Sequence, residues 1–295
     1  MLIIGGSGLV GSTLIEYAAN SYDVHVTINK NEINLNADKV TKIDLIEEPL
    51  NVVKLIKKLE PNFIINTAAH PSVDLCENDH KLADLLHVEI PYHMALVCKE
   101  VGSKLIQFST DAVFDGTSNR KYTEDDKPNP VNYYGKTRLR AEKIILETDI
   151  KNVVLRTAVI YGWHKRSRFS DWIIQSLREK KMVDPHIDQY NTPTLVDDLA
   201  QVILKICKMD ISGLYHAVGK SCISRYEFAQ VLAEKFGLDK NLIKPVTSQE
   251  KKQLAPRPPR TCLDARRLED AINFDFCNID KGVSFIFAKS KVNLQ

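Results

Sequence analysis

Four of the twelve glycines in this 295-residue chain lie between positions 5 and 11, in the segment GGSGLVG. The segment follows a short apolar run, Leu2–Ile4, and opens a run with helical spacing, Leu9–Ala19. The spacing Gly5-x-x-Gly8-x-x-Gly11 lets a strand turn sharply, lets backbone N–H groups approach a pyrophosphate, and lets a helix pack closely on a sheet. A tight turn without a ligand is the alternative. The position at the first strand–helix junction favours a dinucleotide-binding loop.

Beyond this loop, short β-rich apolar runs alternate with longer stretches of helical spacing, as in a parallel sheet covered by helices on both faces. The sequence therefore predicts an α/β fold with a doubly wound parallel Rossmann-type sheet. We expect a cofactor-binding domain over residues 1–162 and a smaller substrate-binding region over 163–295, partly interleaved with the first. The expected strands are Leu2–Ile4, Val24–Ile28, Phe63–Asn66, Leu105–Phe108 and Val153–Leu155, and the expected helices are Leu9–Ala19, Leu50–Leu59, Lys81–Val101 and Tyr134–Thr148.

The composition excludes several classes of protein. The formal net charge is +2, so no global field favours a nucleic acid or a membrane surface as partner. The first fifteen residues carry no charge, but a membrane-spanning helix needs about 20 apolar residues, so we expect a cytoplasmic protein. The six cysteines show no C-x-x-C pair, which predicts reduced core thiols and no metal site. The oligomeric state stays open, with a homodimer as one form.

The loop after the second predicted strand bears on the choice of cofactor. An acidic residue there would bind a ribose 2′-hydroxyl and favour NAD(H), but the segment offers Asn29 and Lys30 and has no carboxylate before Glu32. Lys30 could neutralise a 2′-phosphate, or it could be a solvated loop charge. The balance favours NADP(H), bound also by the backbone of Leu9 and Val10 at the helix N-terminus.

Two further segments are candidates for cofactor contact. Asp44, with the adjacent Leu45, follows a short apolar run and could meet the adenine edge, although a simple loop carboxylate is nearly as good an interpretation. Thr67, Ala68 and Ala69 follow a predicted strand, at the sheet edge where ligands bind in open α/β folds. The two small alanines would let a flat cofactor ring or its ribose lie against the backbone.

A tyrosine and an arginine four residues apart form the candidate catalytic centre. Tyr134 and Arg138 share one face of a predicted helix. A phenol has a pKa near 10 and needs a neighbouring cation to work as an acid–base group at neutral pH, and Arg138 can supply that charge. Thr110 could hydrogen-bond the same reacting oxygen. These three residues suit the polarisation and protonation of a carbonyl.

Seven motifs, taken in order, resemble the dTDP-4-dehydrorhamnose reductases among the extended short-chain dehydrogenase/reductases. They are GGSGLVG, NTAAHPSVDLCE, QFSTDAVFDG, PVNYYGKTRLRAE, VLRTAVIYG, DQYNTPTLVDDLA and GLYHAVG. The resemblance covers nearly the whole chain. It implies hydride transfer from NADPH to C4 of a nucleotide-linked 4-keto-6-deoxysugar in dTDP-L-rhamnose biosynthesis. It also implies that Tyr134 is the proton donor, that Thr110 is its hydroxyl partner, and that Gly5, Gly8 and Gly11 form the cofactor loop.

The chain departs from the family pattern at two positions. The Tyr-x-x-x-Lys motif ends here in Arg138, and arginine does not replace lysine freely where geometry is demanding. Related 4,6-dehydratases carry an Asp-Glu pair where this chain has Asp111 and Ala112, so reduction is favoured over dehydration. The Arg138 departure keeps open an NADP-binding regulatory subunit like that of methionine adenosyltransferase. A nucleotide-sugar epimerase is a third reading.

The substrate is expected to contact the second half of the chain. A diphosphate calls for cationic donors, which the RPPR segment offers, and a second cluster is formed by Lys165, Arg166 and Arg168. It is an equally good interpretation that both clusters are solvated surface charges without a ligand. Gln189, Thr192 and Thr194 in DQYNTPT offer neutral hydrogen bonds that suit sugar hydroxyls. The candidate substrate-binding residues are His70, Asp111, Gln189, Thr192, Arg257 and Arg260.

Overall fold

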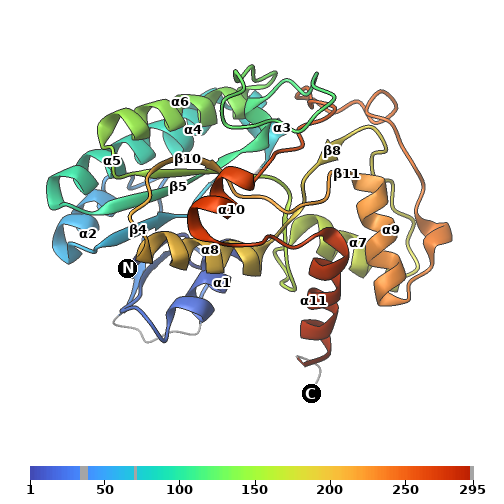
Figure 1. The fold of residues 1–295 in the computed structure, drawn as a ribbon, viewed down its shortest axis with the longest axis horizontal. Helices are drawn as coiled ribbons and strands as arrows, with labels where there is room; N and C mark the ends of the chain where they lie inside the picture. The colour runs from blue at the N-terminus through green and yellow to red at the C-terminus, as the bar shows by residue number, and fades with distance from the viewer. Residues whose placement is uncertain (34–38, 70–71, 293–295) are drawn as a thin grey trace.

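Seven parallel strands form the central sheet of the computed structural model, which describes residues 1–33, 39–69 and 72–292. The strand order is β10-β6-β5-β4-β1-β2-β3, so the chain winds outward from β1 in both directions (Figure 1). The predicted doubly wound fold is confirmed, and the large sheet is extended by two strands that the sequence did not single out, β3 and β10. The strands are β1 (Leu2–Ile4), β2 (His25–Ile28), β3 (Val40–Lys42), β4 (Phe63–Asn66), β5 (Lys104–Thr110), β6 (Val153–Thr157) and β10 (Gly213–His216).

Helices cover both faces of this sheet, and each layer buries its own apolar core. On one face α1 packs against α8, and on the other α5 packs against α2 and α6. No helix in the described part of the chain is long and apolar enough to cross a membrane. The helices of the two layers are α1 (Leu9–Ala18), α8 (Val196–Lys208), α2 (Asn51–Leu59), α5 (Ile90–Val101) and α6 (Tyr133–Thr148).

The single helix expected over Lys81–Val101 is divided into three elements. α4 (His80–Asp84) passes into a π-helical turn, η2 (Leu85–Glu89), before α5 begins. Pro91 sits in the first turn of α5. A proline has no N–H and its ring clashes with the preceding turn, so a regular helix cannot run through this position.

The second half of the chain contributes both to the sheet and to a separate small core. After residue 162 the chain still supplies β10 and α8 to the main layers, whereas α7, α9 and α11 pack together beside them (Figure 1). The boundary near residue 162 stays a prediction. The remaining elements are α3 (Val73–Asn78), η3 (Asp111–Val113), β7 (Ile160–Tyr161), α7 (Arg168–Arg178), β8 (Tyr190–Asn191), β9 (Thr194–Leu195), β11 (Ile223–Ser224), α9 (Arg225–Phe236), η4 (Lys240–Leu242), α10 (Arg266–Ile272) and α11 (Ile279–Val292).

The expectation of six reduced cysteines is wrong for one pair. Cys222 and Cys262 form a disulfide, with their Cα atoms 5.5 Å apart across 40 residues of sequence. Both cysteines flank β8: β11 pairs with β8 directly after Cys222, and Arg260 forms a bridge with Tyr190 two residues before Cys262. Cysteine spacing could not reveal this pairing, because it depends on how distant segments meet.

Candidate functional site

A cleft of about 320 Å³ lies at the carboxyl ends of β1, β2 and β4. It brings together most of the residues predicted to contact the cofactor, although they come from four separate segments. Ser7, Thr27 and Leu86 also line this cleft. The predicted residues that line the cleft are Gly5, Gly8, Asn29, Asp44, Leu45, Thr67, Ala68 and Ala69.

The glycine loop at the base of this cleft suits a pyrophosphate. Gly5 has a φ of +85°, and α1 begins after Gly8 with no side chain capping its N-terminus. The first N–H groups of a helix have no acceptor within it, so those of Leu9, Val10 and Gly11 are available to an anion. A Cβ at Gly11 would lie 2.5 Å from the carbonyl oxygen of Gly5. The residues present therefore fit a dinucleotide.

Among its described lining residues the cleft carries one carboxylate, Asp44, and one cation, Arg166. The pKa of Asp44 is lowered, first by the backbone N–H of Ile46 and then by the Asn29 side chain. Lys30 is exposed and does not line the cleft, although its charge acts on Asp44. Arg166 does line it, so one of the cations assigned to the substrate lies beside the cofactor loop instead.

A second cavity, of about 440 Å³, brings Thr110, Asp111 and Tyr134 together. Thr110 ends β5 and Tyr134 lies in the first turn of α6. A Cβ at Gly135 would lie only 2.2 Å from the carbonyl oxygen of Ala112. Glycine at this position therefore allows α6 to touch the segment after β5, and this close contact places the tyrosine beside the threonine.

Arg138 packs beneath Tyr134 and not in the cavity itself. Its guanidinium carbon lies 5.3 Å from the centre of the tyrosine ring, which is the cation–aromatic contact expected from their spacing. One guanidinium nitrogen donates to the carbonyl oxygen of Phe108 at 3.4 Å, and the buried Nε has no hydrogen-bond partner in the described structure. Arg138 can therefore stabilise a developing phenolate through the ring without lining the cavity.

Asp111 is buried at the junction of the two halves of the chain. Burial raises its pKa, while hydrogen bonds from Thr261, Asn191 and Thr110 oppose that shift. Asn191 Nδ2 lies 2.6 Å from one carboxylate oxygen, and Thr110 donates to the other at 3.1 Å. The carboxylate thus connects the end of β5 to β8 and to the loop that carries Thr261.

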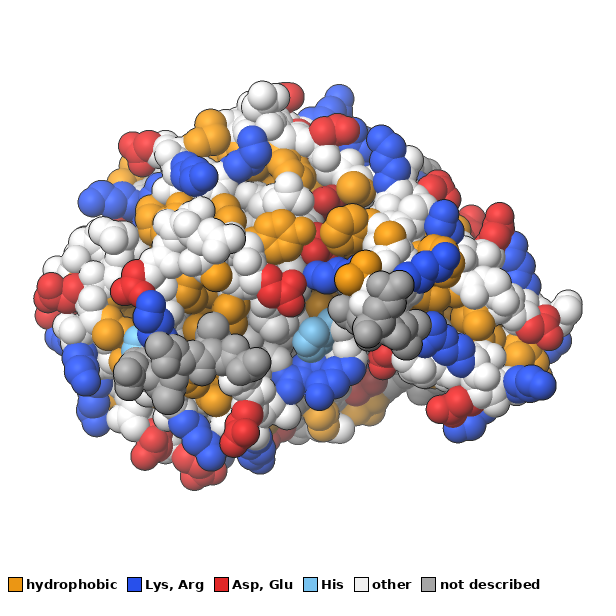
Figure 2. Space-filling view, turned by 90° about the horizontal axis from the view of Figure 1, so that it is seen from below, with side chains coloured by type: hydrophobic (Ala, Val, Ile, Leu, Met, Phe, Trp, Pro, Cys, Tyr) orange, Lys and Arg blue, Asp and Glu red, His pale blue; other side chains and the backbone are white. Residues whose placement is uncertain are grey.

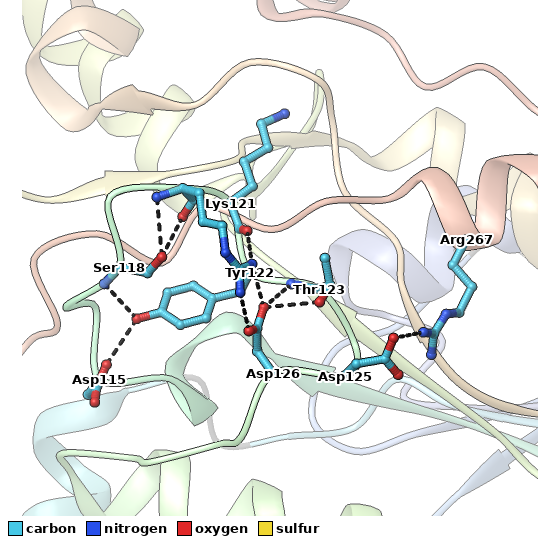
Figure 3. Close-up of polar contacts among 9 residues, drawn as sticks. Asp115, Ser118, Lys121, Tyr122, Thr123, Asp125, Asp126 and Arg267 are labelled. Carbon is cyan, nitrogen blue, oxygen red and sulfur yellow. Dashed lines mark hydrogen bonds and ion pairs between the residues drawn. The ribbon is translucent and has the colours of Figure 1, made fainter.

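A network of polar contacts holds the long segment between β5 and α6 (Figure 3). The Tyr122 hydroxyl donates to Asp115 at 2.9 Å, and Asp126 accepts from the backbone N–H of Thr123 at 2.7 Å. The Asn129 amide is the largest of the hydrogen bonds that hold the pKa of Asp115 down to about 2. Arg267 on α10 forms an ion pair with Asp125. These contacts hold the chain segment that leads to Tyr134, and their residues line neither of the two cavities described above.

The structure places the predicted substrate residues unevenly. Gln189 and Arg257 line the larger cavity with Asp111, and Arg257 forms an ion pair with Asp74 at 3.0 Å. Thr192 is fully buried and Arg260 packs over the Tyr190 ring, so neither lines the cavity. His70 lies outside the described residues. Sequence reasoning missed four further residues that line the cavity: His186, Asn191, Arg225 and Lys251.

The surface seen from below carries acidic and basic side chains interspersed (Figure 2). Hydrophobic side chains form small patches among them on the part of this face that is described. Such a surface agrees with a formal net charge of +2. The charge that an anionic ligand needs therefore comes from individual side chains lining a cavity.

Comparison with known proteins places these features in a family. A family model described as "RmlD substrate binding domain" matches residues 1–291. The methionine adenosyltransferase 2 subunit beta of Xenopus laevis is 34% identical over 277 residues, which cover 91% of this chain and 81% of that protein. The dTDP-4-dehydrorhamnose reductase of Salmonella typhimurium is 31% identical over 237 residues, covering 77% and 78% of the two chains.

A solved structure agrees over the whole fold. The dTDP-4-dehydrorhamnose reductase of Bacillus anthracis in complex with NADP superimposes with a TM-score of 0.84 at 26% identity, covering 98% of each chain. The predicted resemblance is confirmed, and so is the expectation of an NAD(P)-dependent oxidoreductase of the extended short-chain type. The chain belongs to the RmlD substrate-binding domain family.

Proposed function

We propose that this protein uses NADPH to reduce the C4 carbonyl of a nucleotide-linked 4-keto-6-deoxysugar, as in dTDP-L-rhamnose synthesis. The observation that carries the proposal is the larger cavity, where Thr110 and Tyr134 meet Gln189 and Arg257. A hydroxyl and a phenol suit a reacting carbonyl, while an amide and a guanidinium suit sugar hydroxyls and a diphosphate.

Tyr134 and its neighbours supply the proton and the electrostatic support. The chemistry required of the bound cofactor is donation of a hydride to the carbonyl carbon. The Tyr134 phenol gives its proton to the carbonyl oxygen, and the product is the alcohol. The Arg138 guanidinium, packed against the ring, stabilises the phenolate that this transfer leaves. Thr110 lines the same cavity, and its hydroxyl can orient the carbonyl by turning to it from Asp111, to which it donates in this structure.

The walls of the cofactor cleft support NADP(H) over NAD(H). Asn29 stands where an acidic side chain would bind a ribose 2′-hydroxyl, and Arg166 and the nearby Lys30 can neutralise a 2′-phosphate. Titration of the protein with NADPH and NADH, followed by the fluorescence of the reduced nicotinamide, compares the two affinities. We expect NADPH to bind at least tenfold more tightly, and equal affinities would contradict the assignment.

The direct test is turnover. Incubation with dTDP-4-keto-6-deoxy-L-lyxo-hexose and NADPH should consume the reduced-nicotinamide absorbance and yield the 4-hydroxy sugar. No consumption with this ketosugar, under conditions where NADPH binds, would contradict the proposal.

A second candidate is a regulatory subunit that binds NADP without turnover. The observation that favours it is Arg138 in place of the motif lysine, together with the likeness to a methionine adenosyltransferase subunit. Tight NADP binding, no turnover of nucleotide ketosugars and co-purification of a partner enzyme would support this candidate. An epimerase would instead convert its substrate without net consumption of NADPH.

A further inference from the structure

Arg225, the first residue of α9, is a cation with no part in the chemistry proposed above. Its guanidinium carbon lies 5.2 Å from the centre of the Phe169 ring. Among the described residues no hydrogen bond or ion pair engages the guanidinium; only the backbone N–H of Arg225 donates, to the carbonyl oxygen of Gln189. Burial lowers the pKa of Arg225 to about 10, against the raising effect of Asp111.

This placement is unfavourable for the fold. The N-terminus of a helix carries partial positive charge, so a cation in the first turn is repelled. α9 does not need Arg225 for capping, because Ser224 and Glu227 form a complete capping box. A partly buried guanidinium with unused donors also loses hydration. A side chain that costs stability and makes few contacts in return suggests a ligand.

The surroundings of Arg225 indicate where that ligand lies. Arg225 lines the cavity of about 440 Å³ and also an adjoining cavity of about 520 Å³. Thr110, Asp111 and Tyr134 line both cavities as well. Arg225 therefore stands at the reacting end of the site.

The other charged groups of the cavity of about 440 Å³ are already paired. Lys251 contacts Asp184 at 2.6 Å, and Arg257 contacts Asp74. The Asp111 carboxylate accepts three side-chain hydrogen bonds, from Thr261, Asn191 and Thr110. Arg225 is thus the cation whose donors are left for a bound anion within the described part of this cavity.

We propose that Arg225 binds an oxyanion of the substrate beside the reacting carbonyl. A guanidinium meets a phosphate with two parallel hydrogen bonds, and the proposed 4-keto-6-deoxysugar carries no carboxylate, so the oxyanion assigned to Arg225 is the sugar-proximal phosphate of the diphosphate. The inference rests on the proposed function, because it assigns a substrate group to that same site. It makes Arg225 a specificity-determining residue.

Binding measurements with matched variants test this assignment without requiring turnover. Arg225→Met removes the charge and Arg225→Lys keeps it. Arg266→Met is the control, because Arg266 is also the first residue of a helix but is exposed, pairs with Asp264 and lies outside both cavities. Calorimetric titration with UDP, UDP-glucose and UDP-glucuronic acid supplies the three probes, and NADPH binding is measured in parallel.

Each outcome decides the point. A loss of tenfold or more in affinity for all three probes in Arg225→Met assigns the phosphate. Partial rescue is expected in Arg225→Lys because the charge is kept, whereas a loss confined to UDP-glucuronic acid would overturn the phosphate assignment. Changes within twofold for every probe, an equal loss in Arg266→Met, or no binding of any probe by the unmodified protein would overturn the proposal. Failure of NADPH binding would instead count against the proposed function.

Thermal unfolding separates a binding role from a structural one. A ligand-binding Arg225 lowers the stability of the free protein, so Arg225→Met should unfold at the same temperature or a higher one. A clear fall in the unfolding temperature of Arg225→Met, with probe binding unchanged, would show that the arginine serves the fold.

Discussion

The cofactor cleft and the proposed substrate cavity are built from different parts of the chain. The cofactor cleft is formed by the backbone of the glycine loop and by short side chains at the ends of β1, β2 and β4, nearly all within the first 86 residues. The proposed substrate cavity is formed by side chains, several of them charged or aromatic, from segments between residues 73 and 261. In the cofactor cleft the groups available to an anion are the N–H groups at the N-terminus of α1. In the proposed substrate cavity they are individual cationic side chains.

This difference bears on how specific each site is for its ligand. A cleft made of backbone binds the part that all dinucleotides share, and it tolerates little change because glycine has no smaller replacement. A cavity made of side chains from distant segments can change its ligand by one substitution. It depends in turn on whatever holds those segments together, here the Cys222–Cys262 disulfide and the buried Asp111.

The largest effect on stability is expected from the disulfide of the substrate side. Cys222→Ser opens a loop with a sequence separation of 40 residues, which in the chain-entropy model costs about 4 kcal/mol. Chemical denaturation of the oxidised protein and the variant measures the loss. NADPH affinity should be kept while substrate affinity falls. Equal losses at both sites would contradict their independence.

Adding a single methyl group tests the cofactor cleft, which is built from backbone. In Gly11→Ala the new Cβ would lie 2.5 Å from the carbonyl oxygen of Gly5, so the loop must shift. Overpacking of this kind costs about 1–3 kcal/mol, and we expect NADPH to bind up to about 100-fold more weakly. Gly102→Ala is the control for lost stability away from the cleft: a Cβ there meets no atom within 4 Å, but the φ of +75° at Gly102 strains an alanine. Unchanged NADPH affinity in Gly11→Ala would contradict the claim that the cofactor cleft tolerates little change.

Acid should weaken the sheet beneath the substrate side. His216 donates from Nδ1 to the carbonyl oxygen of Asp264, and burial lowers its pKa to about 3. The unfolded chain therefore binds more protons between pH 6.5 and pH 3, so this contribution to stability is complete above pH 6.5 and is lost as the pH falls. The loss between pH 7 and pH 5 is about 2 kcal/mol.

Denaturation curves at both pH values measure this loss. His216→Asn should be less stable at pH 7 but should lose about 2 kcal/mol less on acidification. An unchanged pH dependence in that variant would exclude His216 as the source.

The smallest effect concerns the cation beneath the tyrosine. If arginine is an impaired but working substitute for the motif lysine, Arg138→Lys should raise kcat by up to about tenfold. That rise corresponds to roughly 1.4 kcal/mol in the activation barrier. Steady-state kinetics with saturating NADPH measures the change. A fall in kcat would show that the site is built around arginine.

The sequence could indicate which residues line the cofactor cleft because the information for that cleft is local. Glycine spacing and a strand–helix junction fall within eleven residues, and Tyr134 and Arg138 are one helical turn apart. Arg225 and the disulfide could not be found in this way, since each depends on where β8 and β11 bring distant segments. Arg260, next to Arg257 in the same loop, turns onto Tyr190 instead of into the cavity, and no pattern in RPPR distinguishes the two arginines.

The central claim is that Tyr134 donates the proton at a site where the cofactor binds independently. Tyr134→Phe keeps the ring that packs on Arg138 but removes the hydroxyl. Parallel measurement of NADPH affinity and of ketosugar-dependent NADPH oxidation tests the claim directly. We predict NADPH affinity within about threefold of the unmodified protein and a fall in kcat of about 100-fold or more. Undiminished kcat in Tyr134→Phe would contradict the account.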